Sequence, residues 1–260
     1  MAITSDRLRL AYFDMPKVAN TSLKKTFWEI ETGGYTKDFS QISQSSRLAR
    51  RLLSVLSSSS KAPKDIHHTP GYLSESFIAS KPIPDGYETV AVVRDPILRL
   101  YSAWNDKISA RQHRNVGITQ DILNEGLPED PSFGEFIDNF DAYRFLARPA
   151  RVHTYGYAFH LGPNISWFNH IFKIEEMLRL SEFLSQRVGH NVTIPRENRG
   201  PANMRDGSLT PKQVDRLLEL TANDYQWLGD IYSPENALAR LGLTPHPQDL
   251  GGQCLHEPAC

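Results

Sequence analysis

Residues 88–104 read Glu-Thr-Val-Ala-Val-Val-Arg-Asp-Pro-Ile-Leu-Arg-Leu-Tyr-Ser-Ala-Trp, and the two halves favour different secondary structures. The β-branched run over 88–93 predicts a strand, and its continuously apolar end predicts cover on both faces, as in parallel sheets. Asp95 is a good helix N-cap and Pro96 a good first helical residue. After them, the apolar residues recur at helical spacing: Ile97, Leu100, Tyr101, Trp104 and Ile108.

A second junction of this kind lies near the start of the chain. Residues 8–15 are apolar enough for a buried strand, residues 20–22 offer capping side chains, and a helical stripe follows that Gly33-Gly34 would end. Further along, the pattern predicts a helix over 133–146, a strand over 167–174, and a helix over 175–188. It also predicts a helix over 211–228 that Thr210 caps.

The alternation of strands and helices predicts an α/β fold with a central, mainly parallel sheet. We expect a P-loop-like, three-layer α/β/α arrangement, because strands that alternate with helices predict a parallel sheet with helices on both faces. One domain is expected over residues 1–244, followed by an irregular tail over 245–260, which is rich in Pro and Gly.

The bulk composition excludes few classes of protein. With 29 basic and 30 acidic residues the formal charge is −1, so no basic excess indicates a nucleic-acid partner. Cys254 and Cys260 cannot staple a domain of 260 residues; we favour free thiols, although pairing with each other or with another chain is open. No apolar run suits a signal peptide or a membrane helix. A soluble cytoplasmic protein is expected, with an excised lumenal domain of a longer membrane protein as the alternative.

The first junction has the chemistry of a phosphate site. Residues 13–25 read Phe-Asp-Met-Pro-Lys-Val-Ala-Asn-Thr-Ser-Leu-Lys-Lys. A helix N-terminus favours an anion, Lys17 adds a point charge, and Thr21 and Ser22 add hydroxyl donors. This is not a Walker A motif, and without a glycine in the loop Asn20 is the residue expected to take any left-handed backbone position. An ordinary βα turn with a capping hydroxyl is the alternative.

The second junction offers a complementary pair. Arg94 stands at the strand end with a planar fork suited to a phosphate, and Ser102 lies about two helical turns further on. An arginine paired with a carboxylate and a plain surface serine are the alternative interpretation.

Together the two junctions resemble the PAPS-dependent sulfotransferases, where PAPS is 3′-phosphoadenosine-5′-phosphosulfate. The resembling branch contains carbohydrate sulfotransferases and heparan sulfate 2-O-sulfotransferase. Residues 16–22 are similar to the family's 5′-phosphosulfate loop, and residues 93–102 to its 3′-phosphate motif, with the same arginine-to-serine spacing of eight. Residues 172–177 and 210–225 resemble a later strand and the C-terminal helix, so the resemblance spans about residues 9–232.

The resemblance implies roles for residues of both junctions. The 5′-phosphosulfate would be held by the first loop, namely Lys17, Ala19, Asn20, Thr21 and Ser22. Arg94 and Ser102 would hold the 3′-phosphate, and Lys17 would also neutralise the charge that grows on the departing oxygen. Asn20 departs from the family pattern, in which a small residue is more frequent. PAPS would be the co-substrate, adenosine 3′,5′-bisphosphate the product, and no metal is expected.

The acceptor hydroxyl needs a general base, for which His67 and His68 are the best candidates. His68 is preferred because it directly precedes the Thr69-Pro70 turn; a solvated loop histidine, or a carboxylate such as Asp14 or Glu75, is the alternative. The resemblance favours a carbohydrate acceptor. Two other functions stay open: a P-loop-like nucleotide kinase, and a non-catalytic module that binds a nucleotide or a glycan. The arginines of the polar stretch 191–206 could close over the nucleotide or contact an acidic glycan, or simply face solvent.

Overall fold

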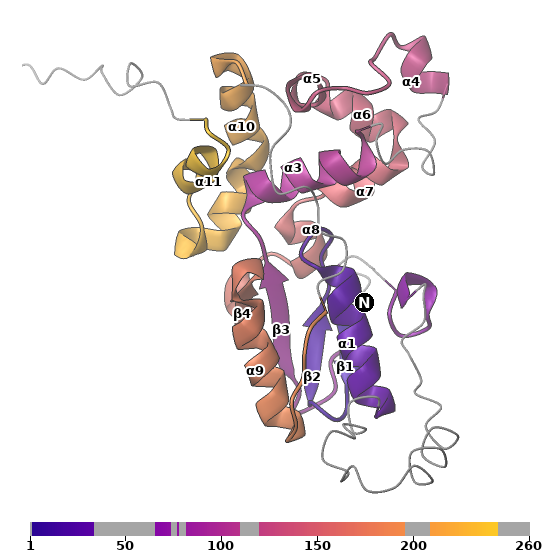
Figure 1. Cartoon of the computed structure of the whole chain (residues 1–260), viewed down its shortest axis with the longest axis vertical. Coiled ribbons are helices and arrows are strands. Elements are labelled where there is room, and N and C mark those ends of the chain that lie inside the picture. The colour runs from indigo at the N-terminus through magenta and orange to yellow at the C-terminus, as the bar shows by residue number, and fades with distance from the viewer. Residues whose placement is uncertain are drawn as a thin grey trace, which may run out of the picture. The chain divides into compact units, whose positions relative to one another are not determined.

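The structure is a computed structural model that describes residues 2–33, 66–73, 77, 82–109, 120–195 and 209–243 (Figure 1). The chain divides into two compact units. The sheet unit comprises residues 1–94 and 151–200, and the helical unit comprises residues 95–150 and 201–260. The expected single domain over 1–244 stays a prediction. Several predicted features lie outside the described residues: Glu75, Arg196, Arg199, Arg205, Cys254, Cys260 and the tail over 245–260.

Four strands form one sheet in the described part of the sheet unit: β1 (Ala2–Ser5), β2 (Leu10–Phe13), β3 (Glu88–Val93) and β4 (His170–Lys173). Their order is β1-β2-β3-β4, with β2, β3 and β4 parallel and β1 antiparallel to β2. The expectation of an α/β fold with a mainly parallel sheet is confirmed. β1 was not expected, because its four residues carry no recognisable alternation.

Two helices cover one face of this sheet: α1 (Asn20–Thr32) and α9 (Met177–Val188). Tyr12 pairs with Val90, and Val90 pairs with His170, so these three side chains point to the same face. Tyr12 stacks on Phe27 of α1, and His170 packs against Phe183 of α9. α1 and α9 therefore lie on the same face, one near each edge of the sheet (Figure 1).

Aromatic side chains cover the opposite face. The ring of Phe13 contacts Phe77, Trp167 and Phe168 at centroid distances of 5.8, 5.0 and 5.5 Å. Trp167 is the last residue of a 3-10 turn, η6 (Ile165–Trp167), which comes after α8 (Tyr157–Leu161), and Phe168 directly follows the turn. Gly162 has a φ of +85°, and a Cβ added there would lie 2.8 Å from the Phe77 ring, so this turn requires glycine.

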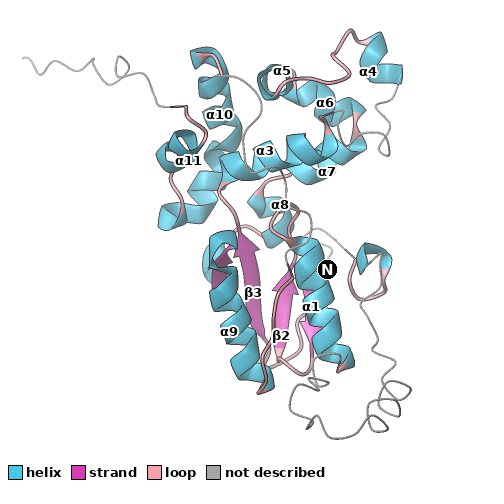
Figure 2. Cartoon of the chain, in the orientation of Figure 1, coloured by secondary structure: helices cyan, strands magenta, loops and turns pink. Residues whose placement is uncertain are grey.

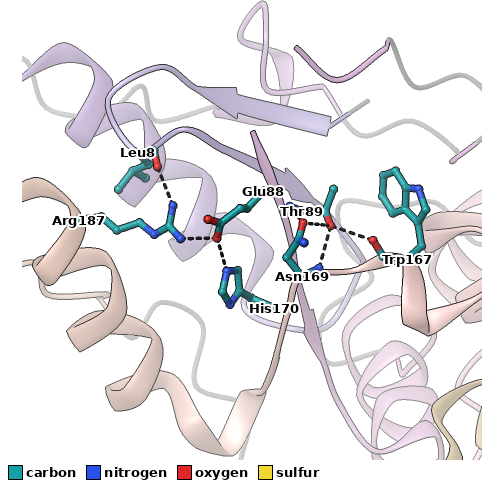
Figure 3. A network of polar contacts seen from close by, with 7 residues as sticks. All are labelled: Leu8, Glu88, Thr89, Trp167, Asn169, His170 and Arg187. Atoms are coloured by element: carbon teal, nitrogen blue, oxygen red, sulfur yellow. Dashed lines mark hydrogen bonds and ion pairs between the residues drawn. The ribbon is translucent and has the colours of Figure 1, made fainter. Parts of the chain in front are cut away.

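The amino ends of the strands are joined by a polar network (Figure 3). Glu88, the first residue of β3, accepts hydrogen bonds from His170 of β4 and from Arg187 of α9. Arg187 also donates to the carbonyl of Leu8, at 3.2 Å. A second group ties β3 to the start of β4 through Thr89, Asn169 and the Trp167 carbonyl. The network fixes the end of the sheet that is remote from the two strand-to-helix junctions.

Helices alone form the described part of the helical unit (Figure 2): α3 (Pro96–Lys107), α4 (Gln120–Asn124), α5 (Phe133–Asp138), α6 (Phe140–Leu146), α10 (Pro211–Leu228), η8 (Gly229–Ile231) and α11 (Pro234–Arg240). A further helix, α7 (Arg148–Thr154), contains a boundary between the units. The core is built on the predicted apolar stripe of α3, with α5, α6 and α10 packed around it. Arg99 and Asp224 form a buried ion pair within it, at 2.9 Å.

The caps of α3 and α10 agree with the sequence. The Asp95 side chain accepts from the Leu98 N–H at the start of α3, with Pro96 as its first residue. Thr210 and Gln213 form a capping box at the start of α10. The predicted helix over 133–146 is wrong in one respect: Asn139 has φ −111° and ψ 26°, which breaks it into α5 and α6. Within the described ranges, no helix combines the length and the apolar character that crossing a membrane requires.

Candidate active site

The loop after β2 bends through two strained residues before α1 begins. Lys17 has a φ of 71° and Ala19 has φ 63° and ψ 31°, so both adopt the left-handed conformation that side chains disfavour. The expectation that Asn20 takes this conformation is wrong, since Asn20 is the first residue of α1 and Ala19 occupies the N-cap position. The predicted capping by residues 20–22 is likewise wrong, because α1 has no side-chain cap.

Buried polar side chains at both ends of this loop contact one another. The Asn20 amide donates to a carboxylate oxygen of Asp14 at 2.9 Å, and the Lys24 ammonium lies 2.9 Å from the same oxygen. The Asp14 and Lys24 side chains are 1% and 0% exposed, so this is a fully desolvated ion pair. The Tyr12 hydroxyl donates to the side-chain amide oxygen of Asn20, Oδ1, at 3.5 Å. Burial, together with the charge of Asp14, raises the pKa of Tyr12. Asp14, engaged in this way, is a poor candidate for the general base.

Arg94 brings the two junctions together. Its guanidinium donates to the backbone carbonyl of Lys17 at 3.2 Å. The contact follows from the topology, because β2 and β3 are parallel neighbours and their carboxyl ends meet at one edge of the sheet. The Tyr157 hydroxyl binds both backbone polar groups of Arg94. The cationic residues of both predicted phosphate motifs therefore belong to one locality of the sheet unit.

The two histidines lie in a 3-10 turn, η3 (Ile66–His68), that packs against α1. A ring nitrogen of His67, Nε2, lies 2.8 Å from the Thr21 hydroxyl, while His68 is exposed. Ile66 is fully buried, and Lys24 donates to the Tyr72 carbonyl beyond the turn. This segment is thus tied to α1, the helix that follows the loop after β2.

The remaining predicted residues have less defined roles. Ser22 is buried on α1, one residue after the half-buried Thr21. Ser102 lies on α3 in the helical unit, so its partnership with Arg94 stays a prediction. Lys24 and Tyr157 were missed by sequence reasoning, because a helical lysine and a helical tyrosine carry no motif.

The donors gathered here suit an anionic group. A lysine, an arginine, hydroxyls and the positive end of a 13-residue helix surround the carboxyl ends of two strands. The Asp14 carboxylate beneath this loop is paired with Lys24. Among the residues with described side chains, no cluster of three or more His, Cys, Asp or Glu could hold a metal ion.

These features define a class: α/β proteins in which groups suited to an anion gather where parallel strands end. The sulfotransferase family matches residues 1–237, and the chain belongs to this family. The expectation of a sulfotransferase is thereby confirmed at the level of the family. No curated protein and no solved structure matches the chain.

Proposed function

We propose that this sulfotransferase uses PAPS as its donor and transfers the sulfuryl group to a hydroxyl of a carbohydrate by in-line displacement. The observation that carries the proposal is the 3.2 Å hydrogen bond from the Arg94 guanidinium to the Lys17 carbonyl. It joins a lysine loop suited to a 5′-phosphosulfate and an arginine suited to a 3′-phosphate. PAPS carries both groups on one adenosine.

The residues of the first loop would hold the donor's reacting end. Lys17 would neutralise negative charge on the bridging oxygen as its bond to sulfur breaks, which is electrostatic stabilisation of the leaving group. The backbone at Ala19 and Asn20, with the Thr21 and Ser22 hydroxyls, would bind the phosphosulfate oxygens at the start of α1. Arg94 and Ser102 would hold the 3′-phosphate, and the product would be adenosine 3′,5′-bisphosphate.

The acceptor oxygen would form its bond to sulfur while a histidine takes the hydroxyl proton. His68 is the residue that the sequence favours. The contact of His67 with Thr21 favours His67 instead, because Thr21 stands at the start of α1 where the sulfuryl group would lie. We therefore propose that either His67 or His68 is the general base, and replacing each one separately distinguishes the two assignments.

We also propose that the fold has a P-loop-like, three-layer arrangement and that the chain belongs to the branch with heparan sulfate 2-O-sulfotransferase. The transfer would need no metal ion. A cytoplasmic location, with a Golgi lumenal enzyme as the alternative, stays a prediction.

The test is transfer of labelled sulfate from PAPS to a panel of glycan, phenol, lipid and peptide hydroxyls. We expect turnover with at least one glycan and a loss of at least about 10²-fold in Lys17→Ala, because the leaving-group charge loses its partner. Lys25→Ala, in the second turn of α1, is the matched control and should keep its activity. Binding of PAPS without turnover on any acceptor would favour the non-catalytic module, and phosphoryl transfer from magnesium ATP would favour the kinase.

A further inference from the structure

Tyr157 belongs to neither of the two predicted phosphate motifs, yet it contacts Arg94 of the second one. It is the first residue of α8, and its side chain is fully buried. Its hydroxyl accepts a hydrogen bond from the Arg94 N–H at 2.9 Å and donates one to the Arg94 carbonyl. One side-chain group thus binds both backbone polar groups of a single residue, which lies 63 positions earlier in the chain.

The position of Arg94 explains why such a partner is useful. β3 ends at Val93, the last residue that pairs with β4, so the backbone groups of Arg94 lie just beyond the paired register. Backbone N–H and C=O groups need partners when they are withdrawn from water. The Tyr157 hydroxyl supplies both partners where the neighbouring strand no longer does, and it thereby restrains the backbone of Arg94.

The restraint extends to the first loop. The guanidinium of Arg94 starts from this fixed backbone and donates to the Lys17 carbonyl at 3.2 Å. Lys17 itself holds a left-handed conformation, with a φ of 71°. A chain of contacts therefore runs from Tyr157 through Arg94 to the strained loop after β2, entirely within the sheet unit.

We propose that Tyr157 is a positioning residue, which holds Arg94 in the geometry that binds the 3′-phosphate of the donor nucleotide. The inference rests on the proposed function. Tyr157 would touch neither the phosphate nor the reacting atoms; it would act through the backbone of Arg94. Preorganising a charged group in this way strengthens binding, because the ligand need not order that group itself.

The first measurement uses Tyr157→Phe, which removes one oxygen atom and keeps the buried ring. Affinities for adenosine 3′,5′-bisphosphate and adenosine 5′-phosphate are measured by calorimetry on wild type and variant. We expect the dissociation constant of the bisphosphate to rise about tenfold, the size expected for a lost hydrogen-bonded restraint on a charged donor. The dissociation constant of the 5′-phosphate should stay within about twofold. A purely structural defect would weaken both ligands alike.

Two further variants separate the possible failures. Arg94→Ala should reduce the affinity for the bisphosphate to that for the 5′-phosphate, and adding Tyr157→Phe to it should produce no further loss, because residues that act as a unit are not additive. Tyr143→Phe is the matched control: Tyr143 is equally buried and donates to the Pro128 carbonyl at 2.7 Å, within the helical unit. It should leave both affinities unchanged.

Equal losses for the two ligands, or no loss in Tyr157→Phe while Arg94→Ala behaves as expected, would overturn the role of Tyr157 and leave the proposed function intact. A wild-type protein that binds both ligands equally, and is insensitive to Arg94→Ala, would overturn both. If Tyr157→Phe does not fold, 4-aminophenylalanine at position 157 keeps the ring and a donor but is a poor acceptor. The same selective loss is then expected, and an unchanged bisphosphate affinity would refute the inference.

Discussion

Lys24 shows how much a single buried charge contributes to this molecule. Its ammonium has an ion-pair partner in Asp14 and a hydrogen-bond acceptor in the Tyr72 carbonyl, and its side chain is 0% exposed. Lys24→Met should lower the free energy of unfolding by about 3–5 kcal/mol, because it leaves the Asp14 carboxylate buried without its counter-charge. Urea unfolding followed by circular dichroism measures the change.

Two variants control for this prediction. Lys107→Met removes an ammonium from a partly exposed pair with Asp106, and should change stability by less than about 1 kcal/mol. The double variant Asp14→Leu with Lys24→Met should regain part of the lost stability, since an apolar pair leaves no buried charge. If Lys24→Met were as stable as wild type, the pair could not be what holds the loop.

The two histidines differ in their surroundings and should differ in their effect. His67→Ala should lower kcat by about 10²–10⁴-fold if His67 is the base, whereas His68→Ala should then lower it by less than about fivefold. The assignment is reversed if His68→Ala gives the larger loss. Each variant is assayed for sulfate transfer from PAPS under the same conditions.

Residue types were enough to nominate the candidate anion-binding residues, but not the buried side chains that support them. Lys17, Thr21 and Arg94 could be singled out because their chemistry fits an anion and their positions follow strands. The Asp14–Lys24 pair and the Tyr157 contact could not, because each depends on which side chains the fold brings together. The choice between His67 and His68 depends on a turn of the backbone that no spacing specifies.

At the level of elements, α10 depends on its N-terminal capping box. The Thr210 hydroxyl accepts from the Gln213 N–H, and the Gln213 side chain accepts from the Thr210 N–H. Thr210→Ala should lower the free energy of unfolding by about 1 kcal/mol, as for other helix caps. Thermal or urea unfolding measures it, with the exposed Gln226→Ala on the same helix expected to stay within about 0.5 kcal/mol. Equal effects of the two variants would show that the box contributes nothing.

Elements whose ends are marked by a capping residue, a proline or a glycine were predictable, and elements without such residues were not. β3 and α3 follow from a β-branched run, an aspartate cap and a proline, and α1 ends at Gly33 as expected. β1 is too short to show a pattern, and its pairing with β2 depends on tertiary contacts. The break at Asn139 lies inside an apolar stripe that continues through both α5 and α6, so periodicity alone does not reveal it.

For the whole molecule, acid should weaken the polar network of Glu88, His170 and Arg187 at the amino ends of the strands. The hydrogen bond with His170 and the nearby Arg187 lower the pKa of Glu88, although partial burial opposes them. A lowered pKa means that the stabilisation is present above the ordinary carboxyl pKa and is lost as the pH falls through the folded-state value. The free energy of unfolding should therefore decrease below about pH 4.

Glu88→Gln isolates this contribution. The wild-type protein should lose more stability than the variant between pH 6 and pH 3, by about 1 kcal/mol or less, because the Glu88 side chain is 43% exposed and water screens the interaction. Urea unfolding at several pH values gives both curves. Parallel curves would mean that Glu88 makes no pH-dependent contribution.

The fold class of the whole molecule was predictable, because strands and helices alternate along the chain. Its division into two units was not, because each unit combines stretches that are distant in sequence. No linker-like sequence marks residues 94 or 150 as boundaries, and residue 200 lies within the polar stretch 191–206, which does not by itself indicate a boundary.

That discontinuity bears on how the protein is synthesised. Residues 1–94 contain β1, β2 and β3, whereas β4 and α9 come from residues 151–200. A ribosome that has released only the first stretch has made β3 with one long edge unpaired, the kind of edge that attracts other chains. Nascent chains whose released part ends before residue 170 should therefore bind chaperones or aggregate. Those whose released part includes residues up to 200 should become resistant to protease.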